Sequence, residues 1–215
     1  MHIVVAGASG RTGRLVVERA LTSGHRVTAI VRAGSEAAVG PGAEILRADV
    51  LSGAGLDLPG DADAVVSALG MRPGDEQPVS APGTTSLIAA MRRAGLSRIV
   101  VVSAVPAFTT GGGEPWWFRI VRTLVRRAMP AVYTDIAAME NVLRSSGLRW
   151  TILRPGYLTD GAPTDYRLLP DRNATTPAHR SDLAHALLAL AEDDAAVGHG
   201  YGLRRGRAGR AEAAA

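Results

Sequence analysis

Runs of consecutive apolar residues recur along this chain, and several of them end in a glycine or a serine. Uninterrupted runs, rather than alternating ones, are typical of strands that are buried on both faces of a sheet. They predict six strands, over residues 2–7, 26–31, 43–50, 61–70, 98–104 and 148–155. A sheet built from such strands needs a cover on each side.

Between these runs the apolar residues recur at helical spacing, as at Leu15, Val16 and Ala20, and glycines mark the helix ends. The spacing predicts helices over residues 11–22, 84–96, 116–129, 136–147 and 181–194. Strands alternating with helices through right-handed crossovers predict an α/β fold, a Rossmann-type doubly wound parallel sheet with helices on both faces. We expect a single domain over residues 1–205 and a disordered tail over residues 206–215.

Two segments, residues 108–132 and 157–180, do not fit the simple alternation. Each follows the carboxyl end of a predicted strand. In open α/β sheets this edge is where ligands bind, so we expect both segments to form the substrate side of the molecule.

Composition excludes several kinds of site. Apolar residues make up 47% of the 215 residues and charged residues 20%, which is ordinary for a folded domain. The chain has no cysteine, which excludes disulfides and cysteine nucleophiles, and its five histidines show no metal-ligand spacing, so we expect no metal. No apolar run reaches the roughly 18–20 residues that span a bilayer. The chain opens on a strand pattern rather than a leader, so we expect a cytoplasmic location and no membrane partner.

Positive charge is the second compositional feature. The net charge is +4, and all 24 basic residues are arginine. The excess lies in residues 119–127 and 204–210. Such patches can bind nucleic acid, but a solvated helix face and a tail also account for them. We expect a small planar substrate as the partner, no direct nucleic-acid contact, and a monomer or homodimer.

The loop GASGRTG lies directly between the first predicted strand and the first predicted helix. Its first glycine permits a tight turn, its second lets the backbone approach a pyrophosphate, and its third allows close packing of the helix. The helix N-terminus offers free N–H groups and a positive dipole end to phosphates. The loop therefore predicts a dinucleotide site, the alternative being a glycine turn without a ligand, and the predicted contacts are Gly7, Ser9, Gly10, Arg11, Thr12 and Gly13.

The residue after the second strand bears on the choice between NAD and NADP. An acidic residue there would bind the ribose 2′-hydroxyl of NAD, but this chain has Arg32. Together with Arg11 it suits a 2′-phosphate, so we predict NADPH or NADP rather than NAD, although a solvent-facing arginine is an alternative. The ends of the third and fourth strands should hold the adenine and its ribose, through Asp49, Val50, Ala68, Leu69 and Gly70.

Candidate catalytic residues lie at the ends of the later strands. Without any lysine the chain cannot form the Tyr-x-x-x-Lys pair of most short-chain dehydrogenases, and Tyr133, with a reference pKa near ~10, would be a poor unassisted base. Ser103 ends the fifth strand, where it could bind a carboxamide or a substrate carbonyl or simply cap a turn. The sixth strand ends at Pro155, Gly156 and Tyr157, which could wall the nicotinamide pocket.

Three consecutive aromatic residues, Trp116, Trp117 and Phe118, begin the helix predicted in the first of the two extra segments. Adjacent aromatic side chains cannot all face one core, so at least one should line a cavity or an interface. A lid over a planar substrate is one interpretation. A plain packed helix and an amphipathic helix that touches a membrane are the alternatives.

The motifs GASGRTG, VVSALG, SRIVVVSA and MENVLRSSGLRWTILRPG, with HRSDLAHALLALAEDD near the end, resemble the atypical short-chain dehydrogenases with an NAD(P)-binding domain. This branch includes the biliverdin/flavin reductases and the NmrA-like proteins. The resemblance covers nearly all of residues 2–203. Two positions depart from it: Ile136 stands where members often have a basic residue, and Gly156 stands where those reductases have histidine.

The resemblance implies NADPH binding and hydride delivery to a planar conjugated acceptor, such as a flavin, quinone, tetrapyrrole or aromatic natural-product intermediate. This chemistry needs positioning more than a strong side-chain base, and Ser103 matches the family's serine at the end of the fifth strand. A non-catalytic NADP(H)-binding redox sensor of the NmrA-like kind is the alternative, favoured by the missing Tyr–Lys pair.

Overall fold

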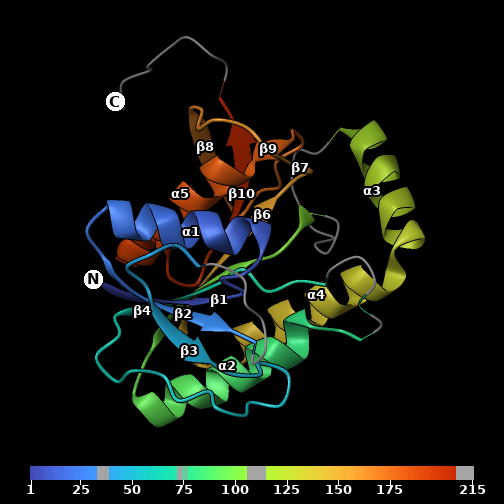
Figure 1. Ribbon diagram of the computed structural model, residues 1–215. Helices are drawn as coiled ribbons and strands as arrows, with labels where there is room; N and C mark the ends of the chain where they lie inside the picture. Colours follow the sequence, from blue (N-terminus) through green and yellow to red (C-terminus); the bar gives the residue numbers. More distant parts are fainter. Residues whose placement is uncertain (33–38, 72–74, 76, 106–114, 207–215) are drawn as a thin grey trace.

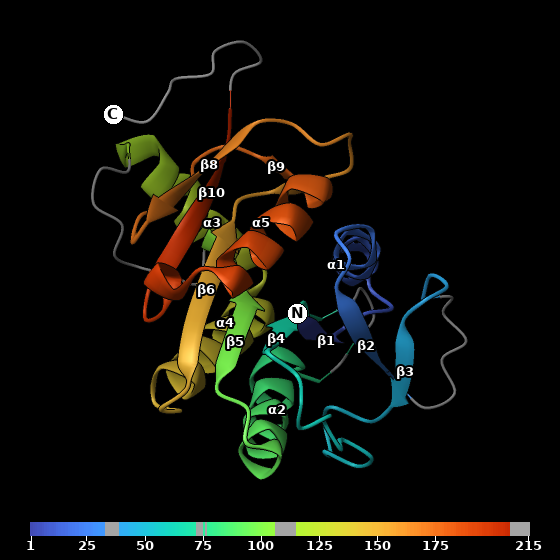
Figure 2. The same ribbon diagram turned by 90° about the vertical axis from the view of Figure 1, so that its left-hand side faces the viewer.

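An eight-stranded sheet runs through the molecule in the order β3–β2–β1–β4–β5–β6–β10–β8, as Figure 2 shows. The computed structural model describes residues 1–32, 39–71, 75, 77–105 and 115–206. All neighbouring strands are parallel except β8, which is antiparallel to β10. The strands of this sheet are β1 (His2–Ala6), β2 (Arg26–Val31), β3 (Glu44–Arg47), β4 (Ala64–Ser67), β5 (Arg98–Val102), β6 (Arg149–Pro155), β8 (Tyr166–Pro170) and β10 (Gly200–Arg205).

Helices cover both faces of the sheet (Figure 1). One apolar core joins the sheet to α1 (Arg11–Thr22) and α5 (Arg180–Glu192), and a second core joins it to α2 (Ser80–Ala94) and α4 (Pro130–Arg144). Helix α3 (Trp116–Ala128) precedes α4 and lies apart from both layers in Figure 1. The remaining elements are β7 (Leu158–Thr159) and β9 (Ala178–His179), which pair with each other, and a 3₁₀ turn η2 (Asp194–Ala196).

The predicted doubly wound α/β fold is confirmed. Each predicted strand and helix has a counterpart, although α2 begins at Ser80 and α4 at Pro130, earlier than the apolar spacing indicates. Strands β8 and β10 were not predicted. The segment expected to be only a substrate-side insertion supplies an edge strand, and Gly206, which we assigned to the tail, donates its amide to the Asp165 carbonyl at 2.6 Å. Residues 207–215 lie outside the described residues.

Strand β10 requires glycine at positions 200 and 202, because neighbouring atoms leave no room for a side chain there. A Cβ at Gly200 would overlap the guanidinium of the buried Arg154, and a Cβ at Gly202 would lie 2.5 Å from the Arg172 carbonyl oxygen. Their low strand propensity hid this strand from the sequence pattern. The strand is nevertheless central to the last third of the chain, because it joins β6 to β8.

Asp135 connects the two helices of the second layer. Its carboxylate, on α4, accepts hydrogen bonds from the amides of Val79 (3.1 Å), Ser80 (2.7 Å) and Ala81 (2.9 Å) at the start of α2. It is 4% exposed. The side chain therefore satisfies N–H groups that would otherwise lack partners and places a negative charge at the positive end of the α2 dipole.

Replacing Asp135 by asparagine should destabilise the fold, because one acceptor oxygen becomes a donor facing buried N–H groups. We expect the free energy of unfolding in urea to fall by about 1–3 kcal/mol. Asp57→Asn, at an exposed position, is the matched control and should change it little. Equal stability of Asp135→Asn and the control would show that the contact contributes nothing.

Candidate functional site

The candidate site lies where the winding of the sheet reverses. Strand β1 pairs in parallel with β2 on one side and β4 on the other. The chain passes from β1 to β2 through α1, but it reaches β4 only after β3, through residues 48–63, which contain no helix. Gly7 follows β1 and Ala68 follows β4, so both backbones leave the sheet at the same carboxyl edge. In open α/β sheets such a reversal opens a crevice that binds ligands.

The glycine loop fits this edge only without side chains at two positions. Gly7 has a φ of +76°, and a Cβ on it would lie 2.8 Å from the Ala68 carbonyl oxygen. A Cβ on Gly13 would overlap the carbonyl of Gly7. The first and third glycines therefore have the roles predicted for them, a tight turn and a close approach of α1 to the end of β1.

The N-terminus of α1 is suited to an anion. Gly10 is its N-cap; the Gly10 amide donates to the Gly7 carbonyl at 2.9 Å, and no side chain in the described part of the chain caps this helix. The first turn contains no acidic residue. Its N–H groups and positive dipole end therefore face the crevice without a negative side chain of their own, which is the arrangement that binds phosphates.

Arg11, predicted to contact the cofactor, forms an ion pair with Asp160. The other oxygen of Asp160 accepts a hydrogen bond from Arg180 Nη1, at the start of α5, at 2.8 Å. Asp160 thus joins the glycine loop to the segment after β7. Its use by two arginines was not visible in the sequence, where Asp160 is one of several acidic residues in a polar stretch. Only Nη2 of Arg11 takes part in this pair, so the other N–H groups of the exposed guanidinium can still donate to a cofactor phosphate.

At the adenine side, Arg32 is exposed just past β2, and Asp49 follows the neighbouring strand β3. Hydrogen bonds from the Ser52 hydroxyl (2.7 Å) and the Leu51 amide (3.0 Å), together with the charge of Arg32, lower the pKa of Asp49. The sequence prediction assigned both residues to the adenosine half of the cofactor because each follows a predicted strand. The structure places the charge of Arg32 near the Asp49 carboxylate.

Val50 and Leu69 come together at Gly83 of α2. A Cβ on Gly83 would lie 2.8 Å from Leu69 Cδ1 and 3.6 Å from Val50 Cγ2. Both residues were predicted to line the adenine side, from the ends of two different strands. The structure brings them to one apolar contact between the sheet edge and α2.

Ser103 belongs to a buried ionic network. Its hydroxyl donates to Glu140 Oε1 at 2.5 Å, and Arg154 donates Nε to Oε1 at 2.8 Å and Nη2 to Oε2 at 2.7 Å. Ser103 is 5%, Glu140 4% and Arg154 1% exposed. Burial raises the pKa of Glu140, but the hydrogen bonds and charge of Arg154, with hydrogen bonds from Ser103 and Arg144, outweigh it and lower that pKa overall.

This network determines what Ser103 can do. Because its proton is donated to a carboxylate, the Oγ of Ser103 is left with acceptor capacity. It can then accept an N–H from a ligand, such as a carboxamide, more readily than it can donate to a carbonyl. The sequence motif contained Glu140 and Arg154, but nothing in their spacing showed that they pair beneath Ser103.

Tyr133, the second predicted catalytic residue, is half-buried near the start of α4. It precedes Glu140 by two helical turns and so shares its face of the helix, about 10 Å further along the axis. Burial raises the pKa of Tyr133, so the phenol keeps its proton near neutral pH and can donate a hydrogen bond but not act as a base.

The other predicted wall residues are placed differently. Pro155 is buried at the end of β6, and a Cβ on Gly156 would lie 2.6 Å from the Thr176 carbonyl oxygen, so this turn packs against the segment before β9. Tyr157 is 78% exposed. Trp116 is 74% and Trp117 48% exposed, whereas Phe118, in edge-to-face contact with Trp117, is half-buried.

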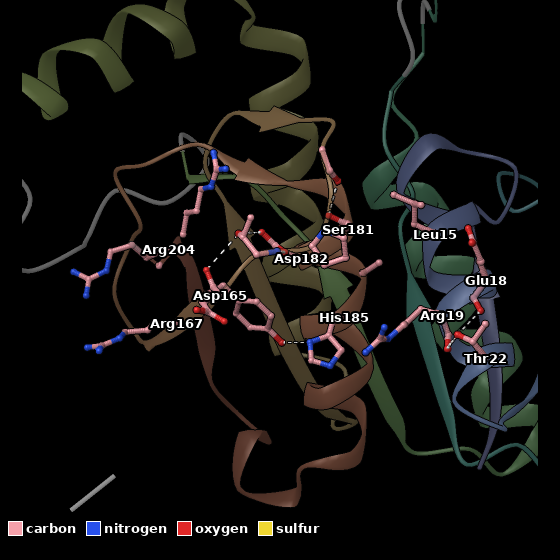
Figure 3. A pocket seen from close by; sticks show the side chains of 17 residues that line it. Leu15, Glu18, Arg19, Thr22, Asp165, Arg167, Ser181, Asp182, His185 and Arg204 are labelled. Atoms are coloured by element: carbon pink, nitrogen blue, oxygen red, sulfur yellow. Dashed lines mark hydrogen bonds between the residues drawn. The ribbon is translucent and has the colours of Figure 1, made fainter. Parts of the chain in front are cut away.

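A groove of about 1830 Å³ between α1, α5 and the β8–β10 pair was not predicted. Figure 3 shows Leu15, Glu18, Arg19 and Thr22 of α1 facing Ser181, Asp182 and His185 of α5 across it. The Tyr166 hydroxyl lies 2.7 Å from His185 Nδ1, and burial, with Asp182, raises the pKa of Tyr166 to about 12. On α1 the groove is lined by Leu15, Glu18, Arg19 and Thr22, which follow the glycine loop in the chain.

Comparison with known proteins defines the class. Residues 7–194 match the NAD(P)H-binding family, and the chain belongs to it. It is 33% identical over 175 residues to an uncharacterized chloroplastic protein of Arabidopsis thaliana, covering 75% of this chain and 61% of that protein. The alignment thus spans less than two thirds of the plant protein. It is also 28% identical over 162 residues to the uncharacterized protein YwnB of Bacillus subtilis, covering 75% of each.

Solved structures share the fold. ChuY, an anaerobillin reductase from Escherichia coli O157:H7, superposes with a TM-score of 0.78 at 22% identity, covering 98% of this chain and all of that one. A short-chain dehydrogenase/reductase from Veillonella parvula in complex with NADP has a TM-score of 0.75 at 21% identity, covering 95% and 94%. The family match identifies the protein as NAD(P)H-binding, and these neighbours show the same Rossmann fold.

The network beneath Ser103 makes a testable contribution to stability. Replacing Glu140 by glutamine removes the buried carboxylate that pairs with Arg154, and we expect the free energy of unfolding to fall by about 3–5 kcal/mol. Because the pKa of Glu140 is lowered in the fold, its contribution is complete above its unfolded pKa and is lost as the pH falls through the folded pKa. Urea unfolding across this acid range should therefore be less pH-dependent in the variant.

Two further variants serve as controls for Glu140→Gln. Glu18→Gln, at an exposed position of α1, should behave as the parent protein does. Replacing both partners, as Glu140→Leu with Arg154→Met, should recover part of the loss because no buried charge remains unpaired. A Glu140→Gln protein with the parent's stability and acid dependence would contradict the role of the ion pair.

Proposed function

We propose that this protein is an NADPH-dependent reductase that transfers hydride to a planar conjugated acceptor at the carboxyl edge of its sheet. The observation that supports it best is the N-terminus of α1, which faces the crevice with no side-chain cap among the described residues and no acid in its first turn. Gly7 and Gly13 fix its position there. These features fit a dinucleotide pyrophosphate.

Arg32 supports NADPH over NADH. It is exposed just past β2, where a residue that contacts the adenosine ribose is expected, and its guanidinium can form charge-assisted hydrogen bonds to a 2′-phosphate. The ionised Asp49 nearby would help to orient that guanidinium. NADP is also the nucleotide in the Veillonella parvula structure.

The side chains near the fifth and sixth strands favour reduction of a conjugated bond over oxidation of an alcohol. The bound cofactor supplies a hydride, and solvent supplies the proton that completes a two-electron reduction. Ser103, with its proton donated to Glu140, would accept an N–H and so orient a carboxamide. Tyr133, with its raised pKa, would donate a hydrogen bond to an electron-rich acceptor atom.

A flat acceptor would lie between these groups and the aromatic side chains of the substrate-side segments. Tyr157 and Phe118 are the two that we assign to this wall, since stacking aligns a planar acceptor with little cost in side-chain entropy. ChuY and SP1627 of Streptococcus pneumoniae, a candidate NADH-flavin reductase (TM-score 0.72, 23% identity, 96% and 100% covered), share the fold. The activities named for these two proteins support a tetrapyrrole, flavin or quinone as the class to test first.

The test is NADPH oxidation followed at 340 nm with FMN, menadione and biliverdin as acceptors. We expect turnover with at least one acceptor, and faster turnover with NADPH than with NADH. Arg32→Ala should weaken NADPH binding about 10- to 100-fold, since a hydrogen bond between charged groups contributes about 1.5–3 kcal/mol, while NADH binding stays within about twofold.

Arg172→Ala, at an exposed site far along the chain, is the matched control and should leave both affinities unchanged. Equal losses for NADPH and NADH in Arg32→Ala would contradict the 2′-phosphate assignment. NADPH binding without turnover of any acceptor would contradict the reductase and favour the redox sensor.

A further inference from the structure

Helix α3 presents an apolar surface that the rest of the described chain does not cover. None of its thirteen residues, all of them described, is buried. Five of its large apolar side chains are exposed, at 74% for Trp116, 58% for Leu124, 51% for Ile120, 48% for Trp117 and 47% for Val121. Burying such side chains is favourable, so this surface is a candidate for contact with another phase or molecule.

The exposed apolar residues form one strip. At 3.6 residues per turn, Trp116, Ile120 and Leu124 follow one another along the helix, with Trp117 and Val121 beside them. The half-buried residues Phe118, Arg122 and Val125 lie on the opposite side, and α3 contacts α4. In Figure 1 the helix lies at the margin of the molecule. The strip therefore faces away from the body of the protein.

Positive charge borders the strip. Arg119, Arg126 and Arg127 are exposed, and the sequence from Pro115 to Thr134 contains no acidic residue. A second copy of this helix would thus bring a further set of arginines without any carboxylate to pair with them. The surface calls for an apolar partner for the strip and negative charge for the arginines. Phosphate groups beside an apolar layer provide both.

We propose that α3 binds a membrane surface rich in anionic lipid, lying in the headgroup plane. The apolar strip would enter the boundary between headgroups and acyl chains, and the arginines would contact lipid phosphates. Tryptophans at the start of the helix suit this boundary because their rings are apolar with one polar N–H. No helix in the described ranges is long and apolar enough to cross a bilayer.

This proposal departs from the sequence-based expectation of no membrane partner, which rested on the lack of a spanning segment. It also assigns Trp116 and Trp117 to lipid rather than to a substrate pocket, in keeping with their exposure. It does not depend on the proposed reductase function, because the strip lies on the side of α3 opposite Phe118, the one residue of this helix that we assign to the substrate wall.

Vesicle binding tests the proposal. Trp150 is the third tryptophan of the chain, so Trp150→Phe gives a protein whose tryptophan emission comes from α3 alone. With vesicles of phosphatidylcholine containing one quarter phosphatidylglycerol, we expect co-sedimentation and a blue shift of that emission. With phosphatidylcholine alone we expect binding at least tenfold weaker, and added salt should weaken the anionic case.

Two pairs of variants separate the strip from the general charge of the protein. Ile120→Gln with Leu124→Gln should abolish binding, whereas Ile45→Gln, at an apolar residue 44% exposed on β3, should not affect it. Arg119→Gln with Arg126→Gln should weaken binding about 20- to 30-fold, at about 1 kcal/mol for each charge near the surface. Arg47→Gln with Arg172→Gln removes the same charge from exposed sites elsewhere and should have little effect.

The outcomes are distinct. No binding to anionic vesicles, or equal effects of the α3 variants and their controls, would overturn the proposal. A dimer in solution that Ile120→Gln with Leu124→Gln dissociates would assign the strip to a second copy instead. NADPH affinity, measured in parallel, should be unchanged by all of these variants, so a failure here is distinguishable from a failure of the reductase proposal.

Discussion

The close approach of α1 to the end of β1 is the constraint on which the candidate site depends. It exists because Gly13 has no side chain to meet the carbonyl of Gly7, and because Gly7 adopts a positive φ beside Ala68. With these contacts the first turn of α1 is directed at the crevice between β1 and β4. A helix start held at this reversal of the sheet provides a phosphate site through backbone groups alone.

Helix α4 organises the other half of the site. Asp135 holds the start of α2, and one and a half turns later Glu140 joins Arg154 of β6 to Ser103 at the end of β5. Because Arg154 is fully buried, its pairing with Glu140 is costly to break, and Gly200 on β10 leaves room for it. Four elements are thereby tied together beneath the side chain proposed to orient the nicotinamide.

Much of the fold was predictable because buried parallel strands and covering helices leave strong apolar patterns. The glycine loop could also be predicted, because its residues act through backbone geometry that only glycine allows. Strands β8 and β10 were not, because an edge strand and a glycine-containing strand carry little apolar signal. Pairings between distant residues, such as Arg11 with Asp160 and Glu140 with Arg154, depend on the tertiary fold and could not be deduced from spacing. The exposure of α3 could not be deduced either, because amphipathic spacing does not show whether the apolar side of a helix packs against the rest of the protein.

The central claim is that the crevice between β1 and β4 holds NADP(H), and a crystal structure of the protein with NADP⁺ tests it most directly. Our account predicts the pyrophosphate within hydrogen-bond distance of the amides at the start of α1 and the 2′-phosphate in contact with Arg32. A nucleotide bound instead in the groove between α1 and α5, or a 2′-phosphate directed away from Arg32, would contradict it.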